Sequence, residues 1–355
     1  MTWSRKLLMS LIVLIISFSA GFAHGIPSGG EYPPVFTRQL GEWYDSWGFN
    51  RNDYGGADGF LPNVAYESVG TDRELAYELG EWFRSNYVQK TDRAEAILAY
   101  VQRWTDYGYD SDNVRMEGEP QEEWAWNADE MAHMFDEATL SVAIGDCEDM
   151  AFLCSTIYLA ADFDVVLVSP PEHVAIMIWL PEYDNANYYW DIPYDGRRHG
   201  WIWVEATGEK NPLGWTPPDF ADGEWEVYFI GFSEFNVELS PPYPQEGDDV
   251  TIAASIVSAR GTVNQALMNY SIGNIEQVMT MVADDSVFEA VIPGQPDGTK
   301  VKCVVSAVDS LGFSREYTLE YVVGRNFELP PYFLEAAIVF LVIVIISVLF
   351  GRSRS

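Results

Sequence analysis

The sequence has few basic residues. Its 355 residues include 20 Lys and Arg against 54 Asp and Glu, which gives a formal net charge of −34 and an isoelectric point near 4.2. Binding to phosphate groups needs clustered Lys and Arg, so this balance excludes a nucleic-acid partner. We interpret the excess of acidic residues as a solvated surface, which would favour a basic or cationic substrate through electrostatic steering.

Cysteine and histidine are also scarce, with three and four residues. Cys147 and Cys154 would stand about 10 Å apart along one predicted helix, which is too far for a disulfide. Cys303 falls in a separate predicted domain, where it alternates with valines and is expected to be a buried core thiol. No run of carboxylates has the spacing of a calcium-binding loop. The sequence therefore predicts no disulfide framework, no specific metal and no cofactor.

Apolar residues, by contrast, are plentiful. Hydrophobic residues make up 48% of the chain and aromatic residues 15%, which is enough for a sizeable packed core. Aromatic side chains also line grooves that hold peptides or sugars. The tryptophans between Trp190 and Trp203 are nevertheless interpreted as core packing rather than as a sugar-binding platform.

Both ends of the chain carry an apolar segment. Residues 1–23 combine two basic residues, a short apolar run and small residues at their end, which is the pattern of a secretory signal peptide. Residues 332–350 are long enough to span a bilayer as a helix. Arg352 and Arg354 follow at once, so the positive-inside rule places the short C-terminus in the cytoplasm. The sequence predicts a single-pass protein of the cell membrane, with its main body extracytoplasmic.

The residue pattern between these ends changes twice. Residues 24–70 are rich in Gly, Pro, Tyr and Trp, show no clear period and are interpreted as an irregular lead segment. Residues 71–220 carry helical periodicity followed by β-branched runs, the order of an α+β domain. Residues 226–323 contain short alternating runs separated by turns, which predict an Ig-like or fibronectin-like β-sandwich.

The α+β region contains recognisable starts of helices and strands. Helices are expected to begin at Thr71, Thr91, Asn127 and Asp146, with capping boxes at the first and third of these. Strands are expected over residues 164–169, 173–180, 188–191 and 201–206.

The fourth helix start carries a candidate nucleophile. Asp146 is a natural N-cap, and it places Cys147 in the first helical turn. Thiolates are favoured at helix N-termini, because free N–H groups and the helix dipole stabilise negative charge. The same N–H groups could receive an oxyanion. The neighbouring acids oppose the thiolate by repulsion, so a base is needed for the remaining activation.

Two further residues suit the roles of base and orienting acid. His173 follows a Pro-Pro-Glu turn and begins an apolar strand, so its ring can sit at the edge of a cleft. Glu205 ends an aromatic strand, and an acid after four largely buried positions needs a partner. Cys147, His173 and Glu205 thus form a candidate triad of nucleophile, base and orienting group.

These features resemble the transglutaminase-like superfamily, whose fold is related to that of papain. The resemblance covers about residues 70–215. It rests on an upstream helix over residues 94–104 and on the segments Gly145-Asp146-Cys147, His173-Val174-Ala175 and Trp203-Val204-Glu205-Ala206-Thr207. The family often has Asp where this chain has Glu205, and Glu, one methylene longer, can do the same work.

The resemblance implies the fold and the site roles. It implies a papain-like catalytic domain with Cys147 as nucleophile, His173 as general base and acid, and Glu205 as the residue that orients His173. Family enzymes also use an upstream side chain in the oxyanion hole, for which Trp126 and Asn127 are candidates.

The activity implied is acyl transfer on peptide or amide bonds through a thioester, with a protein or peptide substrate at the cell surface. Water as acceptor would make the chain a peptidase or amidase, and an amine would make it a cross-linking enzyme; the sequence leaves both open. The alternative is a non-catalytic surface protein that binds peptide or envelope polymer through the same domain.

Overall fold

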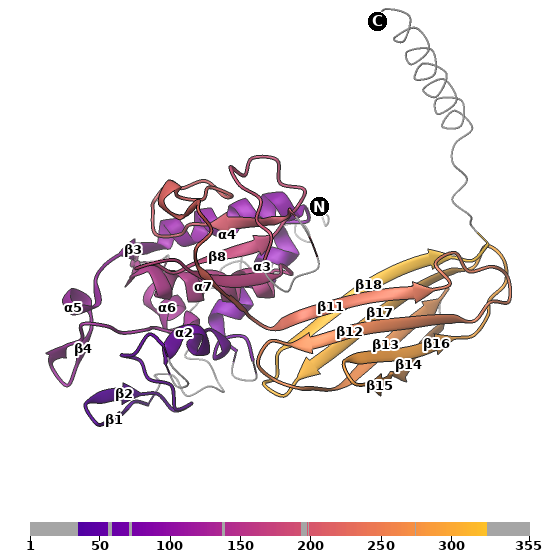
Figure 1. Ribbon diagram of the computed structural model, residues 1–355, viewed down its shortest axis with the longest axis horizontal. Coiled ribbons are helices and arrows are strands. Elements are labelled where there is room, and N and C mark those ends of the chain that lie inside the picture. Colours follow the sequence, from indigo (N-terminus) through magenta and orange to yellow (C-terminus); the bar gives the residue numbers. More distant parts are fainter. Residues whose placement is uncertain are drawn as a thin grey trace, which may run out of the picture. The chain divides into compact units, whose positions relative to one another are not determined.

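A computed structural model describes residues 35–55, 59–70, 73–136, 139–192, 197, 199–273 and 275–324 (Figure 1). The predicted signal peptide (1–23), the predicted membrane span (332–350) and the predicted helix start at Thr71 lie outside these residues. Within the described ranges, none of the helices is both long and apolar enough to cross a membrane.

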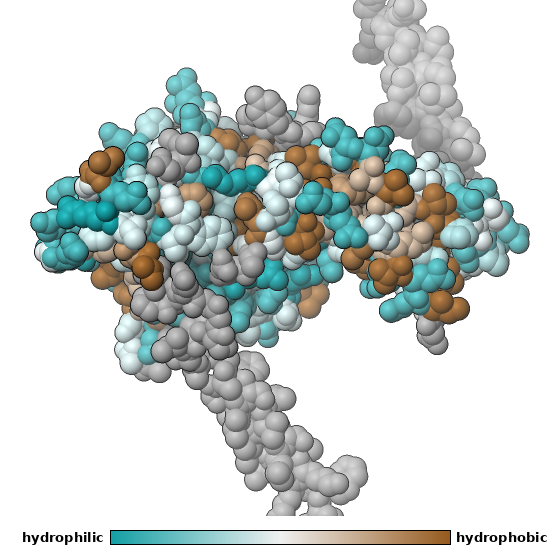
Figure 2. Space-filling view, turned by 90° about the horizontal axis from the view of Figure 1, so that it is seen from below, coloured by the Kyte–Doolittle hydropathy of each residue, from teal (hydrophilic) through white to brown (hydrophobic). Residues whose placement is uncertain are grey.

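The structure is a mixed α and β protein that divides into two compact units. The first holds the residues up to Asn236 together with Ser255–Ala266 and Ser306–Arg315. The second holds Val237–Ala254, Leu267–Val305 and the residues from Glu316 onward. On the face shown in Figure 2, hydrophilic and hydrophobic residues are interspersed.

The helical part of the first unit is built around one buried helix. Helix α7 (Cys147–Ala160) is buried along nearly its whole length. Packed against it are α3 (Leu75–Asn86), α4 (Lys90–Trp104) and α6 (Ala128–Met134). Gly80 of α3 permits the close approach, because a Cβ there would lie 2.4 Å from the Ile157 carbonyl oxygen of α7.

A four-stranded antiparallel sheet completes this core. Its strand order is β10 (Glu226–Phe229), β7 (Val165–Ser169), β8 (Ala175–Trp179) and β9 (Trp201–Val204). Trp201 and Trp203 are fully buried in a cluster with Val166, Val168 and Met177. The sequence analysis assigned Glu226 onward to the sandwich, but β10 pairs with β7, with Glu226 opposite Ser169. The sheet therefore extends beyond the predicted domain end at residue 220.

Several predicted boundaries shift by one or two residues. Helix α4 begins at Lys90 rather than Thr91. Strand β8 begins at Ala175, so His173 lies in the turn before the strand rather than in it. The strand expected over residues 188–191 is reduced to one bridge between Trp190 and Trp201.

The lead segment is more regular than the sequence suggested. Its described part contains the hairpin β1 (Thr37–Gln39) and β2 (Glu42–Tyr44), followed by α2 (Phe60–Asn63) and the 3₁₀ turn η1 (Val64–Tyr66). The other short elements are β3 (Thr105–Tyr107), α5 (Asp110–Asn113), β4 (Arg115–Met116), β5 (Glu119–Pro120), β6 (Ala143–Gly145) and η2 (Pro218–Phe220).

The remaining strands form two four-stranded sheets. One has the order β11 (Phe232–Ser240), β12 (Val250–Ser258), β16 (Val287–Ile292) and β15 (Val282–Asp284). The other has the order β14 (Ile275–Thr280), β13 (Val263–Ile272), β17 (Lys300–Asp309) and β18 (Ser314–Val322). Buried positions alternate along β12 and β17. Cys303 is one of them and is fully buried, as expected for a core thiol.

Candidate active site

The nucleophile candidate lies where a strand runs directly into a helix. Strand β6 pairs in parallel with β3 and places Gly145 opposite Tyr107. Asp146 then caps α7 in a capping box with Asp149, whose Oδ2 accepts the Asp146 N–H at 3.1 Å. Gly145 has no room for a side chain, because a Cβ there would lie 2.5 Å from that same Oδ2. These contacts fix the half-buried Cys147 at the first position of the helix.

The second part of the site is a buried carboxylate that holds an imidazole. His173 Nε2 donates to Glu205 Oε2 at 3.0 Å, and Glu205 is only 3% exposed. The Trp203 indole N–H donates to the same oxygen at 3.1 Å. The N–H and hydroxyl of Thr207 donate to Oε1 at 3.2 and 2.6 Å. With both oxygens occupied by donors, Glu205 fixes the orientation of the His173 ring.

The sequence analysis missed an aromatic ring that covers this pair. Phe220 of η2 stacks on His173 with ring centroids 5.2 Å apart and planes 11° apart. It also stacks on Trp203 at 5.8 Å. The only local signal was an aromatic residue shortly after a Pro-Pro pair, which says nothing about its contact with a distant histidine.

His173 is influenced by both the carboxylate and the thiol. Its Nε2 donates to Glu205, which leaves Nδ1 free of that hydrogen bond. Burial opposes the charged imidazolium, but hydrogen bonds with Cys147 and Glu205 and the charge of Glu205 outweigh it, and they raise the pKa of His173 to about 9. Burial also disfavours the ionised form of Glu205. The hydrogen bond from His173 and the positive charge of the His173 ring outweigh burial, so the pKa of this carboxyl is lowered. The structure thus brings all three predicted triad residues together.

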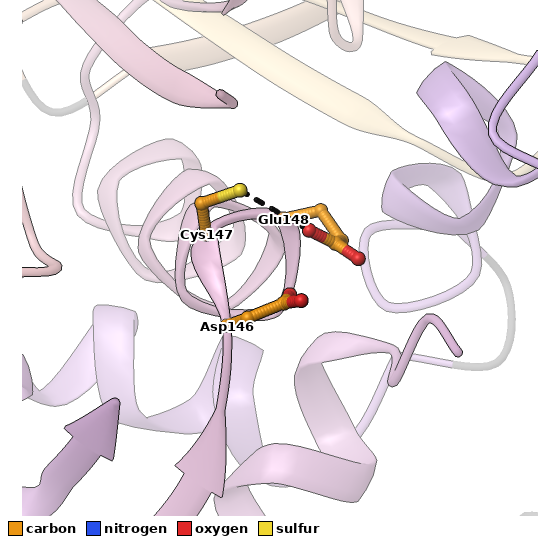
Figure 3. A group of neighbouring side chains, drawn as sticks. All are labelled: Asp146, Cys147 and Glu148. Carbon is orange, nitrogen blue, oxygen red and sulfur yellow. Dashed lines mark hydrogen bonds between the residues drawn. The ribbon is translucent and has the colours of Figure 1, made fainter. Parts of the chain in front are cut away.

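A fourth residue contacts the thiol. The Cys147 Sγ–H donates to Glu148 Oε2 at 3.3 Å (Figure 3). Glu148 is 3% exposed, and its other oxygen, Oε1, has no hydrogen-bond partner in the part of the chain that the structure describes. The buried Asp146 Oδ1 also has no hydrogen-bond partner among the described residues. Two unsatisfied carboxylate oxygens thus lie beside the nucleophile.

These oxygens belong to a larger acidic cluster. Carboxylate oxygens from three segments of the chain lie within 4.8 Å of one another in overlapping groups, and the residues are Asp110, Glu123, Asp146, Glu148 and Asp149. Burial is the main cause that raises the pKa of each of these carboxyls, and for all but Asp146 repulsion from neighbouring carboxylates adds to it; the pKa of Asp110 rises to about 8. Several carboxylate oxygens are the ligands that a hard cation such as Ca²⁺ prefers. The sequence predicted no specific metal, but this arrangement could hold one.

Calcium should therefore stabilise the protein, and more strongly at pH 8 than at pH 5. The pKa of Asp110 is raised above its unfolded value of 3.8, so its contribution is present at low pH and is lost as pH rises towards 8. A bound cation offsets that loss by about 2.7 kcal/mol at a hundred times its Kd. Thermal unfolding with calcium or with a chelator measures the effect.

Two variants check that the cluster is responsible. Glu148→Gln and Asp146→Asn should remove most of the calcium effect, whereas Glu78→Gln, an exposed acid on α3, should keep it. If millimolar calcium does not change the melting temperature of the wild type at pH 8, the cluster binds no calcium and its carboxyl groups are neutralised by protons alone.

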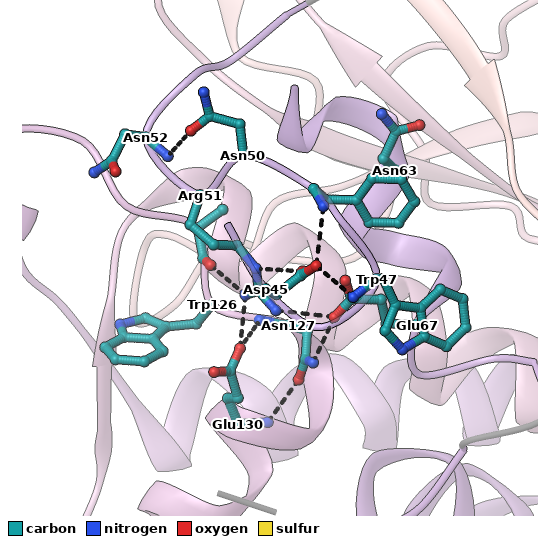
Figure 4. Close-up of polar contacts among 12 residues, drawn as sticks. Asp45, Trp47, Asn50, Arg51, Asn52, Asn63, Glu67, Trp126, Asn127 and Glu130 are labelled. Atoms are coloured by element: carbon teal, nitrogen blue, oxygen red, sulfur yellow. Dashed lines mark hydrogen bonds and ion pairs between the residues drawn. The ribbon is translucent and has the colours of Figure 1, made fainter. Parts of the chain in front are cut away.

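The two residues predicted for the oxyanion hole, Asn127 and Trp126, differ in which of their donors already form hydrogen bonds. Asn127 is a helix cap: its Oδ1 accepts the Glu130 N–H at 2.8 Å, and its side-chain amide donates to Glu67 at 2.9 Å. Its backbone N–H donates to Glu130 at 2.7 Å, which leaves one side-chain N–H, and the role of Asn127 stays a prediction. The Trp126 N–H donates to Asp149 at 2.7 Å. The Trp126 indole takes no part in the hydrogen bonds around it (Figure 4), and its N–H also stays a candidate.

Comparisons with known proteins do not assign this chain to a family. No family model matches the sequence, and no curated protein matches it. Similar solved structures cover about a quarter of the chain. A bromine derivative of BhCBM56 is 12% identical over 26% of this chain and 98% of its own, with a TM-score of 0.21. A fibronectin type III domain of the human collagen alpha-1(XX) chain is 17% identical over 28% and 93%, with a TM-score of 0.21. A cycloalternan-degrading enzyme from Trueperella pyogenes is 21% identical over 23% of this chain and 11% of its own, with a TM-score of 0.21.

Proposed function

We propose that this chain is a membrane-anchored, extracytoplasmic cysteine enzyme of the transglutaminase-like class, acting on peptide or amide bonds. The observation that carries the proposal is His173, which buried Glu205 holds at 3.0 Å and whose pKa is raised by both Cys147 and Glu205. The membrane and extracytoplasmic parts of the proposal rest on the apolar segments at the two ends of the sequence.

The geometry supports a two-step acyl transfer. The Cys147 thiolate attacks the amide carbonyl carbon, and the C–N bond then breaks as the His173 imidazolium gives its proton to the leaving amine. The carbonyl carbon is left bound to sulfur as a thioester. His173, now neutral, takes a proton from the incoming nucleophile, which displaces the thiolate. Water yields an acid, and an amine yields a new amide.

Backbone N–H groups at the helix start supply the electrostatic part. The first N–H groups of a helix have no acceptor within the helix, and Cys147 occupies the first position of α7. An oxyanion on the attacked carbonyl can therefore accept a hydrogen bond from the Cys147 N–H. Such preorganised donors are typically worth 10²–10³ in kcat each. The Trp126 indole N–H is a candidate for a second donor.

Alkylation of Cys147 tests this proposal without a known substrate. The full chain should react with iodoacetamide near pH 7 roughly ten to a hundred times faster than a free thiol does, because only the thiolate reacts. Cys154 and Cys303 are fully buried, and burial raises the pKa of both thiols, so they should contribute no background. Cys147→Ala should lose the labelling, and His173→Ala should slow it to the rate of a free thiol.

The opposite result is equally clear. If Cys147 reacts no faster than a free thiol and His173→Ala changes nothing, the triad is not active. The domain is then a binding module for peptide or envelope polymer, the alternative that the sequence left open.

A further inference from the structure

A cavity of about 410 Å³ is lined by two loop segments next to the four-stranded sheet and by Val227 of its edge strand β10. Its lining includes Tyr189, Trp190, Asp191, His199 and Trp225. The sequence analysis interpreted the tryptophans from 190 to 203 as core packing. The structure separates them: Trp201 and Trp203 are fully buried, whereas Trp190 and Trp225 are only partly buried and line the cavity.

The aromatic walls of this cavity are held in place. Trp190 stacks on Tyr188 with centroids 5.3 Å apart, and it meets Trp225 edge to face at 4.7 Å. The Trp190 indole N–H donates to the Thr216 hydroxyl at 3.1 Å. Rings fixed in this way present a prepared surface, so a ligand would not need to order them on binding.

Polar groups stand at the same cavity. Asp191 Oδ1 accepts the backbone N–H of His199 at 2.7 Å, and His199 Nδ1 lies 3.4 Å from the same oxygen. Both side chains are exposed. The cavity therefore combines apolar ring surfaces with an acceptor and a titratable donor, the mixture of many fixed apolar atoms and few polar groups that is typical of small-ligand sites.

The neighbouring backbone does not favour an extended peptide. Peptides often bind by adding a strand to a free sheet edge. Here Trp190 already occupies that position: its N–H donates to the Trp201 carbonyl at 2.8 Å, and the Trp201 N–H donates back at 3.4 Å. A ligand in the cavity must then be recognised by its side groups rather than by its backbone.

We propose that this cavity is a carbohydrate-binding subsite. A pyranose ring presents an apolar C–H face, which suits Trp190 and Trp225, and hydroxyl groups, which suit Asp191 and His199. The volume lies in the range of small-ligand pockets, about 300–1,000 Å³. Uncharged sugars also incur no penalty from the protein's net charge of −34.

The subsite connects to the candidate active site through aromatic contacts. Trp225 meets Trp203 at 5.4 Å, Trp203 stacks on Phe220 at 5.8 Å, and Phe220 stacks on His173 at 5.2 Å. A sugar in the cavity would therefore lie a few rings from the catalytic base. Resting on the proposed function, this identifies the substrate class as peptides attached to a glycan.

Saturation-transfer NMR on the full chain tests the subsite. The protein is kept in a zwitterionic detergent, because sugar detergents would compete, and the probes are chitotriose, maltotriose and mannotriose. At least one should bind with a Kd of about 1 mM or below, in the range of weak specific binding. Trp190→Phe and Asp191→Asn should each weaken it at least tenfold. Tyr243→Ala, an exposed aromatic outside the cavity, should not.

Three results would overturn the proposal. The first is that none of the three sugars binds at 10 mM. The second is that sugar affinity is unchanged in both Trp190→Phe and Asp191→Asn. The third is that N-acetyl-phenylalaninamide displaces the bound sugar at equal concentration. The last would assign the cavity to an aromatic peptide side chain. Cys147→Ala should bind sugar like the wild type, so loss of the subsite and failure of the triad are told apart by NMR and by alkylation.

Discussion

Replacing Glu205 with Gln should lower the pKa of His173 from its value of about 9. Glu205 supplies both a hydrogen bond and a negative charge to the ring, whereas burial acts in the opposite direction. With the charge removed, only the contributions of Cys147 oppose burial, so the pKa of His173 should fall. Each unit by which this pKa falls changes the imidazolium equilibrium tenfold. Turnover on an amide substrate should fall by about 10² to 10⁴, as expected when the group orienting a catalytic histidine loses its charge.

NMR titration measures this pKa directly, because the chain has only four histidines to assign. The pH profile of Cys147 alkylation is the second readout. Glu209→Gln, an exposed acid shortly after the strand, is the matched control and should leave both unchanged. If Glu205→Gln leaves the titration of His173 unaltered, the carboxylate does not orient the base, and the proposed triad reduces to two residues.

The same pair makes stability depend on pH. The folded-state pKa of His173 lies above the unfolded value of 6.5, so its stabilising contribution is fully present below pH 6.5 and is lost as pH rises through about 9. The free energy of unfolding of the wild type should therefore fall across this window, by about 3 kcal/mol at most. Urea unfolding at several pH values should show a smaller fall for Glu205→Gln.

Local signals in the sequence predicted the helix starts of the site well. The Asn127–Glu130 capping box forms with both of its reciprocal hydrogen bonds. Asp146 caps α7 as expected and leaves Cys147 at the first helical position. Such caps involve residues three positions apart, so the chain sequence alone contains what is needed to recognise them.

The contacts of the site that join distant segments were harder to predict. Asp110 and Glu123 reach the cluster beside Cys147 from segments that precede it by more than twenty residues, Asp110 from the short helix α5 and Glu123 from a loop. Phe220 reaches His173 from a turn that the sequence placed at the edge of the domain. Neither contact has a periodic or spacing signal, because it depends on how the loops fold over the sheet.

The lead segment shows the same limitation on a larger scale. Its mixed composition has no helical or strand period, and the sequence analysis described it only as irregular. The structure places Arg51 of this segment completely inside the protein. A buried arginine cannot be recognised from its neighbours in the sequence, because its partners lie up to 79 residues away.

Arg51→Met should therefore be the most destabilising single substitution among those considered, costing about 3–5 kcal/mol. The Arg51 guanidinium donates to Asp45 at 2.8 Å, Glu67 at 2.9 Å and Glu130 at 2.7 Å (Figure 4). Methionine fills much of the space but leaves three buried carboxyl groups without their cation. Burial already raises the pKa of Glu67 well above its usual value in the presence of Arg51. Urea unfolding compares the variant with Arg38→Met, whose arginine is exposed.

A second substitution separates charge from packing. If uncompensated carboxylates cause the loss, adding Glu67→Gln to Arg51→Met should recover part of it, and the double-mutant cycle should show strong coupling. Additive effects would instead attribute the loss to packing.

The Arg51 network also has a consequence for the site. Arg51 makes two hydrogen bonds with the backbone of Ala125. Its guanidinium donates to the Ala125 carbonyl at 2.6 Å, and its own carbonyl accepts the Ala125 N–H at 2.9 Å. The next residue, Trp126, donates its N–H to Asp149 in the first turn of α7. We therefore expect Cys147 to be alkylated more slowly in Arg51→Met than in the wild type, even at urea concentrations too low to unfold either protein. An unchanged rate in the folded variant would show that the lead segment stabilises the domain without positioning the nucleophile.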